Sequence, residues 1–183
     1  MALFTRDALI SRANLELQKS YNSKTPGNIL SESYLAFSSV KIYDIFLSHS
    51  FLDAKVILGL KKTLEDMNYA VYVDWIDDRQ LSRNNVNAAT ANQLRQRMKN
   101  CKSLFFATSD NSSESKWMPW ELGYFDELKN KVAILPITTS TAKNGYEGQE
   151  YLGLYDYADN VNGQIFIRCL NRTYKTYKSW LEN

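Results

Sequence analysis

The sequence predicts an α/β fold, a doubly wound parallel sheet of about five strands with helices on both faces and a helical extension before it. Three observations support this prediction. Short apolar runs of the kind that form buried parallel strands alternate with segments whose apolar residues recur every three or four positions. No apolar run is long enough to span a membrane. The 183 residues, 44% hydrophobic and 23% charged, have the size and composition of one globular domain.

The chain is expected to divide into an N-terminal helical extension, residues 1–40, and a main domain, residues 41–183. Apolar residues at helical spacing over residues 5–21 indicate an amphipathic helix that packs on the domain or on a partner. Turn-forming residues at 23–28 then predict a linker between this helix and the rest of the chain.

The first half of the main domain shows alternating strand and helix signals. Residues 42–47 form a short, mostly apolar run, as expected of a buried parallel strand. Leucine or valine then recurs every four positions over residues 52–64, which predicts a helix. Residues 69–73 predict the second strand. After a polar loop, apolar residues at helical spacing over 91–98 predict the second helix, and residues 103–108 predict the third strand.

The second half repeats this pattern once and ends less regularly. A serine-rich stretch that can cap a helix precedes residues 116–129, where apolar residues again follow helical spacing. Pro119 falls in the first turn of this helix, where its missing N–H group has little effect. Residues 131–137 predict the fourth strand, residues 164–168 a fifth, and residues 177–181 a closing helical turn.

Polar side chains follow the first two predicted strands. Ser48, His49 and Ser50 end the first, and Asp74 and Trp75 end the second. In an open parallel sheet, ligands bind beyond the carboxyl ends of the strands, so we expect these residues to contact the phosphate or ribose of a ligand. The alternative for the serines is capping of the following helix, and His49 could act as a general base.

Trp117 and Glu121 form the most informative pair in the sequence. Because residues four apart share a helix face, an indole and a carboxylate would stand side by side. A fixed carboxylate can stabilise the positive charge that develops on an anomeric carbon, or anchor ribose hydroxyls, and the indole can stack on a flat ring. The alternative for Glu121 is a solvated acid in the first helical turn, favoured by the helix dipole.

The loop that follows the second strand is rich in charged and aromatic residues. Arg79 or Arg83 could pair with a diphosphate. The loop over residues 74–87 is also expected to close over a substrate or to contact a neighbouring subunit in a homo-oligomer. The alternative is an ordinary exposed loop.

In this order, these segments resemble the Toll/interleukin-1 receptor (TIR) domain family, in its bacterial branch. The resemblance covers about residues 41–160. Residues 45–53 are similar to the first strand and loop of that family, residues 72–74 to the end of its second strand, and residues 77–87 to its mobile loop. Residues 117–121, Trp-Met-Pro-Trp-Glu, match the Trp-x-x-x-Glu motif of its enzymatic members.

The resemblance implies a flavodoxin-like sheet and an enzyme that cleaves NAD+ with Glu121 as its catalytic residue. NAD+ would be the substrate, and no cofactor is expected. Small bacterial chains of this kind resemble the signal-producing subunit of Thoeris anti-phage systems, in which a cyclic ADP-ribose isomer reaches a separate effector by diffusion. The expected products are ADP-ribose, a cyclic isomer or both. The alternative is a non-catalytic TIR scaffold that acts by self-association.

Composition argues against several other classes of protein. The formal charge of +2 is small and dispersed, so no nucleic-acid partner is expected, and no membrane partner either. The two cysteines are far apart and only one histidine is present, so we expect no metal site. Arg6 and Asp7 interrupt the N-terminal apolar stretch, which argues against a signal peptide and favours a reducing, cytoplasmic location. A phospho-receiver domain would need paired acids after the first strand, where this chain has Ser48, His49 and Ser50.

Overall fold

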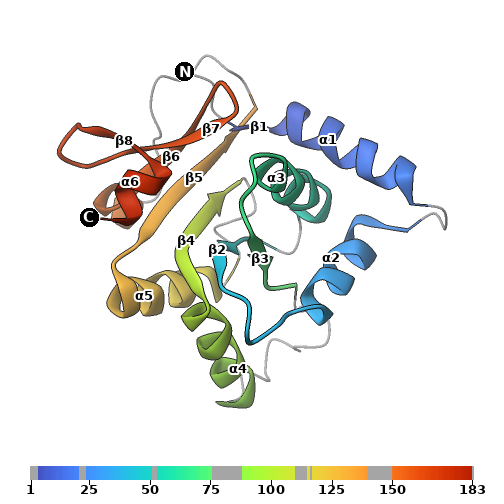
Figure 1. Ribbon diagram of the computed structural model, residues 1–183, viewed down its shortest axis with the longest axis horizontal. Helices are drawn as coiled ribbons and strands as arrows, with labels where there is room; N and C mark the ends of the chain where they lie inside the picture. The colour runs from blue at the N-terminus through green and yellow to red at the C-terminus, as the bar shows by residue number, and fades with distance from the viewer. Residues whose placement is uncertain are drawn as a thin grey trace.

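A computed structural model describes residues 4–20, 24–50, 53–75, 88–109, 115, 117–139 and 150–182. These residues form an eight-stranded sheet with helices on both sides (Figure 1). Along the sheet, the strand order is β3 (Val71–Val73), β2 (Tyr43–Ser48), β4 (Cys101–Thr108), β5 (Val132–Thr138), β6 (Asp156–Val161), β7 (Gln164–Arg168) and β8 (Tyr174–Thr176). A short strand, β1 (Phe4–Thr5), pairs with β5 outside this series.

The central five strands, from β3 to β6, run parallel to one another. Their spatial order places the second strand of the domain at the edge and the first strand inside it, which is the flavodoxin-like arrangement. The predicted fold class is therefore confirmed. The sheet then continues through two antiparallel strands, β7 and β8. The sequence predicted β7 and not β6 or β8, because the apolar runs that identify buried strands are missing from both.

The helices form two layers that bury opposite faces of the parallel strands (Figure 1). One layer contains α1 (Arg6–Lys19), α2 (Pro26–Leu35) and α3 (Ala54–Asp66), and the other contains α4 (Ala88–Lys99) and α5 (Trp117–Lys129). Because strand side chains alternate between faces, Ile45 and Leu47 of β2 belong to the first core, while Phe46 belongs to the second. A 3-10 helix, η3 (Glu150–Leu154), precedes β6, and α6 (Tyr177–Leu181) closes the chain. Within the described residues, no helix has the length and apolarity to cross a membrane.

The N-terminal residues are integrated into this architecture. β1 extends the sheet beside the end of β5, with Phe4 paired to Ile137. The helix predicted over residues 5–21 is confirmed as α1, and it packs on α3 at Gly59, where an added Cβ would lie 1.9 Å from the Leu9 carbonyl oxygen. Only glycine permits this backbone contact. The domain boundary at residue 40 stays a prediction.

The linker predicted over residues 23–28 is wrong from Pro26 onward, because α2 begins there. Thr25 caps this helix: its Oγ1 accepts a hydrogen bond from the Asn28 backbone N–H at 3.2 Å, and Asn28 Oδ1 accepts from the Thr25 N–H at 3.1 Å. Threonine followed by proline at the first helical position is a helix-start signature. The same residue types also form turns, which is why the sequence favoured a linker.

Candidate functional site

A hydrogen bond between the end of β2 and the beginning of α5 forms the centre of the candidate site. Ser48 is the last residue of β2, and its Oγ donates to Glu121 Oε2 at 2.5 Å. The two residues are only 1% and 6% exposed. A hydroxyl that donates to a buried carboxylate makes a strong, charge-assisted bond, which fixes the orientation of that carboxylate. Ser48 thus holds Glu121 at the carboxyl edge of the sheet.

This burial corrects one alternative that the sequence left open, a solvated acid in the first turn of the helix. α5 begins at Trp117, so Glu121 lies in the second turn, and its side chain faces the end of β2. The helix dipole therefore does not account for its position. Nor does the hydroxyl of Ser48 cap the following helix, because it donates to Glu121 and the N-cap residue of α3 is Asp53.

Trp117 is the first residue of α5 and lies one helical turn before Glu121. Its half-buried ring packs edge-on against Trp120, with ring centroids 5.4 Å apart and an interplanar angle of 87°. Trp120 in turn stacks on Tyr124 at 5.7 Å. This aromatic cluster fixes the Trp117 indole, and its uncovered part can contact a flat ligand beside the carboxylate.

His49 stacks on Trp75, with ring centroids 5.3 Å apart and planes 3° from parallel. Its Nδ1 lies 3.1 Å from the Leu47 carbonyl oxygen, so the neutral ring donates from Nδ1. Burial lowers the pKa of His49 to about 4, although this hydrogen bond favours the protonated form. The ring is therefore neutral near pH 7 and has no spare proton to give. Trp75 is buried in the first core, next to Gly27 of α2.

A second polar group, which the sequence did not predict as a unit, lies around Asp53. The backbone N–H of Asp53 donates to the Ser50 carbonyl oxygen at 3.2 Å, and the Ser109 hydroxyl donates to Asp53 Oδ2. Arg6 Nη1 lies 3.6 Å from Asp53 Oδ1. The N-terminal extension thus brings a cation to the edge where β4 ends. No spacing in the sequence links Arg6 to Asp53, so only the fold reveals this contact.

Asp74 lies at the same edge, and its carboxylate is engaged by neighbouring side chains. Tyr72 donates to Asp74 Oδ1 at 2.6 Å, and Arg97 Nη1 lies 3.4 Å from the same oxygen. Burial raises the pKa of Asp74 to about 6, against the opposing effects of both partners. The Arg97 guanidinium also lies 3.8 Å from the centroid of the Tyr34 ring. Substrate binding by Asp74 stays a prediction.

The two arginines predicted to bind a diphosphate, Arg79 and Arg83, lie outside the described residues, as does most of the 74–87 loop. Of the predicted site residues that the structure describes, Ser48 and Glu121 are in direct contact, and so are His49 and Trp75. Among the described side chains, no group of three or more His, Cys, Asp or Glu residues could hold a metal ion.

The family model of the TIR domain matches residues 45–166. The chain belongs to the TIR-domain family. A relative from Bacillus cereus (strain MSX-D12), named probable 3' cyclic ADP-D-ribose synthase ThsB', is 50% identical over 191 aligned positions, which cover all of this chain and 99% of that protein. The putative cyclic ADP-D-ribose synthase TIR2 of Cytobacillus dafuensis is 38% identical over 89 residues, or 48% of this chain and 24% of that protein. The TIR resemblance is confirmed.

In this TIR domain, the fold places the Trp-x-x-x-Glu segment where an open parallel sheet binds ligands. This edge of the sheet carries a buried, oriented carboxylate, a half-buried indole one helical turn before it, and a neutral imidazole that stacks on Trp75 of the first core. Such a site can stabilise a developing cation in surroundings where electrostatic interactions are stronger than in water. It is poorly suited to donate a proton.

Proposed function

We propose that this TIR-domain protein is an NAD+-cleaving enzyme that releases nicotinamide and forms ADP-ribose, a cyclic ADP-ribose isomer or both. The observation that carries this proposal is the buried Glu121 carboxylate, held by Ser48 at the carboxyl edge of the sheet. The names of the two relatives, both cyclic ADP-D-ribose synthases, support the same reaction class.

Glu121 acts on the bond between nicotinamide and ribose. As this bond breaks, its electron pair moves to the nicotinamide ring nitrogen, and positive charge develops on the anomeric carbon. The fixed carboxylate stabilises that charge or anchors the ribose hydroxyls. Nicotinamide leaves as a neutral molecule, so the reaction needs no general acid. This requirement fits the Glu121 site, where the carboxylate accepts a hydrogen bond from the Ser48 hydroxyl.

Two nucleophiles can capture the cation. Water gives linear ADP-ribose, and a nucleophile from the adenosine end of the same molecule gives a ring. The second route requires the substrate to fold back while water is excluded, and a well-placed intramolecular nucleophile then has a high effective concentration. Trp117, half-buried and one helical turn before Glu121, is proposed to cover the reacting ribose. The cyclic product would serve as a diffusible signal to a separate effector in anti-phage defence.

The remaining parts of the proposal concern binding and setting. Ser48 orients the carboxylate, while His49, Ser50 and Trp75 shape the edge at which the substrate binds. Arg79, Arg83 and Asp74 are proposed to contact the diphosphate or ribose. The enzyme needs no cofactor beyond its substrate, works in the cytoplasm, and assembles into a homo-oligomer through residues 74–87.

Incubation of the purified protein with NAD+ tests this function. Chromatography should detect nicotinamide, and mass spectrometry should detect a second product that is lighter than ADP-ribose by one water. Protein concentrations high enough to favour assembly should be included, because the 74–87 loop is proposed to contact a neighbouring subunit. NAD+ that stays intact under all these conditions would favour the non-catalytic scaffold instead.

A further inference from the structure

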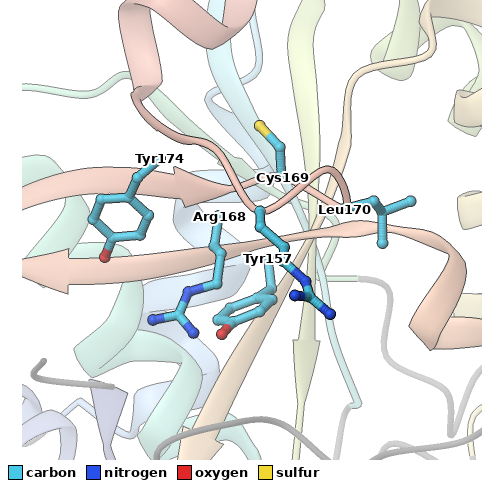
Figure 2. Close-up of a pocket in the computed structure, with 6 residues that line it drawn as sticks. Tyr157, Arg168, Cys169, Leu170 and Tyr174 are labelled. Carbon is cyan, nitrogen blue, oxygen red and sulfur yellow. The ribbon is translucent and has the colours of Figure 1, made fainter.

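A cavity of about 720 Å³ lies over the last strands of the sheet, β6 to β8 (Figure 2). Tyr157, one of its lining residues, pairs with Ile134 near the beginning of β5. The cavity is therefore near the amino ends of the parallel strands, whereas Ser48 lies at the carboxyl end of β2. Its lining residues are Tyr157, Arg168, Cys169, Leu170, Arg172 and Tyr174.

Three of these residues form a row across neighbouring strands. Arg168 of β7 pairs with Tyr157 of β6 on one side and with Tyr174 of β8 on the other. Side chains of directly opposite residues share a face of the sheet. The Arg168 guanidinium carbon lies 5.1 Å from the Tyr157 ring centroid and 5.7 Å from that of Tyr174, and Figure 2 shows it between the two rings. The Arg168 guanidinium, flanked by two tyrosine rings, thus forms the floor of the cavity.

Asp159 and Phe166 hold Tyr174 in position. Its hydroxyl donates to Asp159 Oδ2 at 2.7 Å, and its ring stacks on Phe166 with centroids 5.3 Å apart. Asp159 is fully buried, and within the described residues its Oδ1 has no hydrogen-bond partner. A buried, half-satisfied carboxylate is destabilising and is found where it has a further role. Here it holds the phenol that lines the cavity, so the aromatic wall is preorganised.

Arg172 adds a second cation at the turn between β7 and β8. This turn is closed by two backbone hydrogen bonds of 2.9 Å, from the Cys169 N–H to the Thr173 carbonyl oxygen and from the Arg172 N–H to the Cys169 carbonyl oxygen. Arg172 adopts a positive φ of 65°, which is unusual for a residue with a side chain. The lining residues therefore include two guanidinium groups and no carboxylate.

The nearby acid Asp156 is directed to other partners. Its Oδ1 accepts from the Leu170 N–H at 2.9 Å, and its Oδ2 accepts from the Trp180 indole N–H at 2.8 Å. These bonds hold the turn and α6 in place, and Asp156 does not line the cavity. The lining thus carries two guanidinium groups between aromatic walls, and the buried Asp159 carboxylate behind Tyr174 offsets part of their charge.

We propose that this cavity binds a nucleoside phosphate at a site separate from the NAD+-cleaving centre. Its volume lies within the range of about 300–1000 Å³ that is typical of small-molecule sites. Two guanidinium groups suit a phosphate, because arginine donates to phosphate oxygens in a bidentate manner. The Tyr174 ring already stacks on Phe166 and lies beside Arg168, so the half-buried Tyr157 ring is the surface on which a base can stack. A flat, anionic compound matches both features, and the proposal does not depend on NAD+ cleavage.

Isothermal titration calorimetry of the full chain with AMP measures binding, and two variants assign it to this cavity. Titration with AMP up to millimolar concentration should give a saturable heat of binding. The absence of any binding heat at millimolar AMP would overturn the proposal.

Two variants separate this site from other sites. Arg172→Gln should raise the Kd of AMP about tenfold, through the loss of a charge-assisted phosphate contact. Lys175→Gln removes the same charge from β8, but Lys175 lies opposite Ile167 of the other core and so points away from the cavity. This variant should bind AMP like the parent. Equal Kd values in Arg172→Gln and Lys175→Gln would contradict the assignment.

Two further measurements define the ligand and the independence of the site. Inorganic phosphate alone should bind about tenfold more weakly than AMP in the same titration, because it lacks a base to stack on Tyr157. An equal Kd for phosphate would reduce the cavity to a simple anion site and refute the nucleoside part. NAD+ cleavage by Arg172→Gln should match that of the parent, and its loss would contradict the separation of the two sites.

Discussion

Replacement of Ser48 by alanine tests the contact that defines the candidate site. The change removes the hydroxyl that donates to Glu121 at 2.5 Å and leaves a carboxylate that is 6% exposed with one donor fewer. Hydrogen bonds to charged groups contribute about 1.5–3 kcal/mol, so unfolding free energy should fall by this amount. For a chain of this size, the melting temperature should fall by roughly 3–12 °C. The looser carboxylate should also lower kcat by about ten- to a hundredfold.

Urea unfolding and nicotinamide release are the assays for this prediction. Ser103→Ala is a matched control, because Ser103 is also fully buried and, among the described residues, its hydroxyl contacts the neutral Tyr177 hydroxyl and the Asp44 carbonyl oxygen. It should cost about 0.5–1.5 kcal/mol and leave kcat unchanged.

A double-mutant cycle with Glu121→Gln isolates the contribution of the negative charge. The coupling between Ser48 and Glu121 should be about 1 kcal/mol, because a charged acceptor is replaced by a neutral one. Additive effects of the two substitutions, together with an unchanged kcat in Ser48→Ala, would show that the hydrogen bond does not orient the catalytic group.

Three further predictions concern the extension, the pH dependence and the product. Gly59→Val should destabilise the fold by at least about 1–3 kcal/mol, because a Cβ would lie 1.9 Å from a backbone oxygen of α1; Gly123→Ala, with no atom within 4 Å, should not destabilise it, as denaturant unfolding can check. The pKa of Asp74 is raised to about 6, so the stability that its protonated form contributes is lost as pH rises from 4 to 6. The pKa of His49 is lowered to about 4, so the stability that its neutral form contributes is lost as pH falls through the same range. Asp74→Asn should therefore add about +1.4 kcal/mol per pH unit to the slope of unfolding free energy between pH 4 and 6, and His49→Gln should change it by a similar amount in the opposite sense; unchanged slopes would contradict these shifts. Trp117→Ala should slow NAD+ cleavage and shift the product ratio towards linear ADP-ribose, and a constant ratio by mass spectrometry would remove the indole from the control of cyclisation.

The central strands could be predicted because burial on both faces leaves a continuous apolar run in the sequence. β6 reads Asp-Tyr-Ala-Asp-Asn-Val and carries no such run, yet it pairs with β5 and β7 and buries Asp159. β8 is only three residues long. Its pairing depends on β7, which lies earlier in the chain, and no local signal could reveal it. Pairing with neighbouring strands therefore determines β6 and β8, and the local sequence pattern does not reveal them.

The site shows the same division. Ser48 and Glu121 could each be predicted, one from its place at a strand end and the other from the Trp-x-x-x-Glu spacing. Their hydrogen bond joins residues 73 positions apart, and the burial of the carboxylate follows from how α5 packs on β2. The Arg6–Asp53 contact also depends on tertiary packing. Sequence patterns identify chemistry on one element, while contacts between elements require the fold.

Comparison of Glu121→Gln with Glu127→Gln tests the central claim most directly. Both substitutions remove one negative charge from α5, but Glu121 is buried against Ser48 and Glu127 is exposed. Nicotinamide release from NAD+ should fall at least about a hundredfold in Glu121→Gln, the scale seen when a key electrostatic group is lost, and should be unchanged in Glu127→Gln. A folded Glu121→Gln protein that releases nicotinamide at the parent rate would contradict the assignment of Glu121 as the catalytic residue.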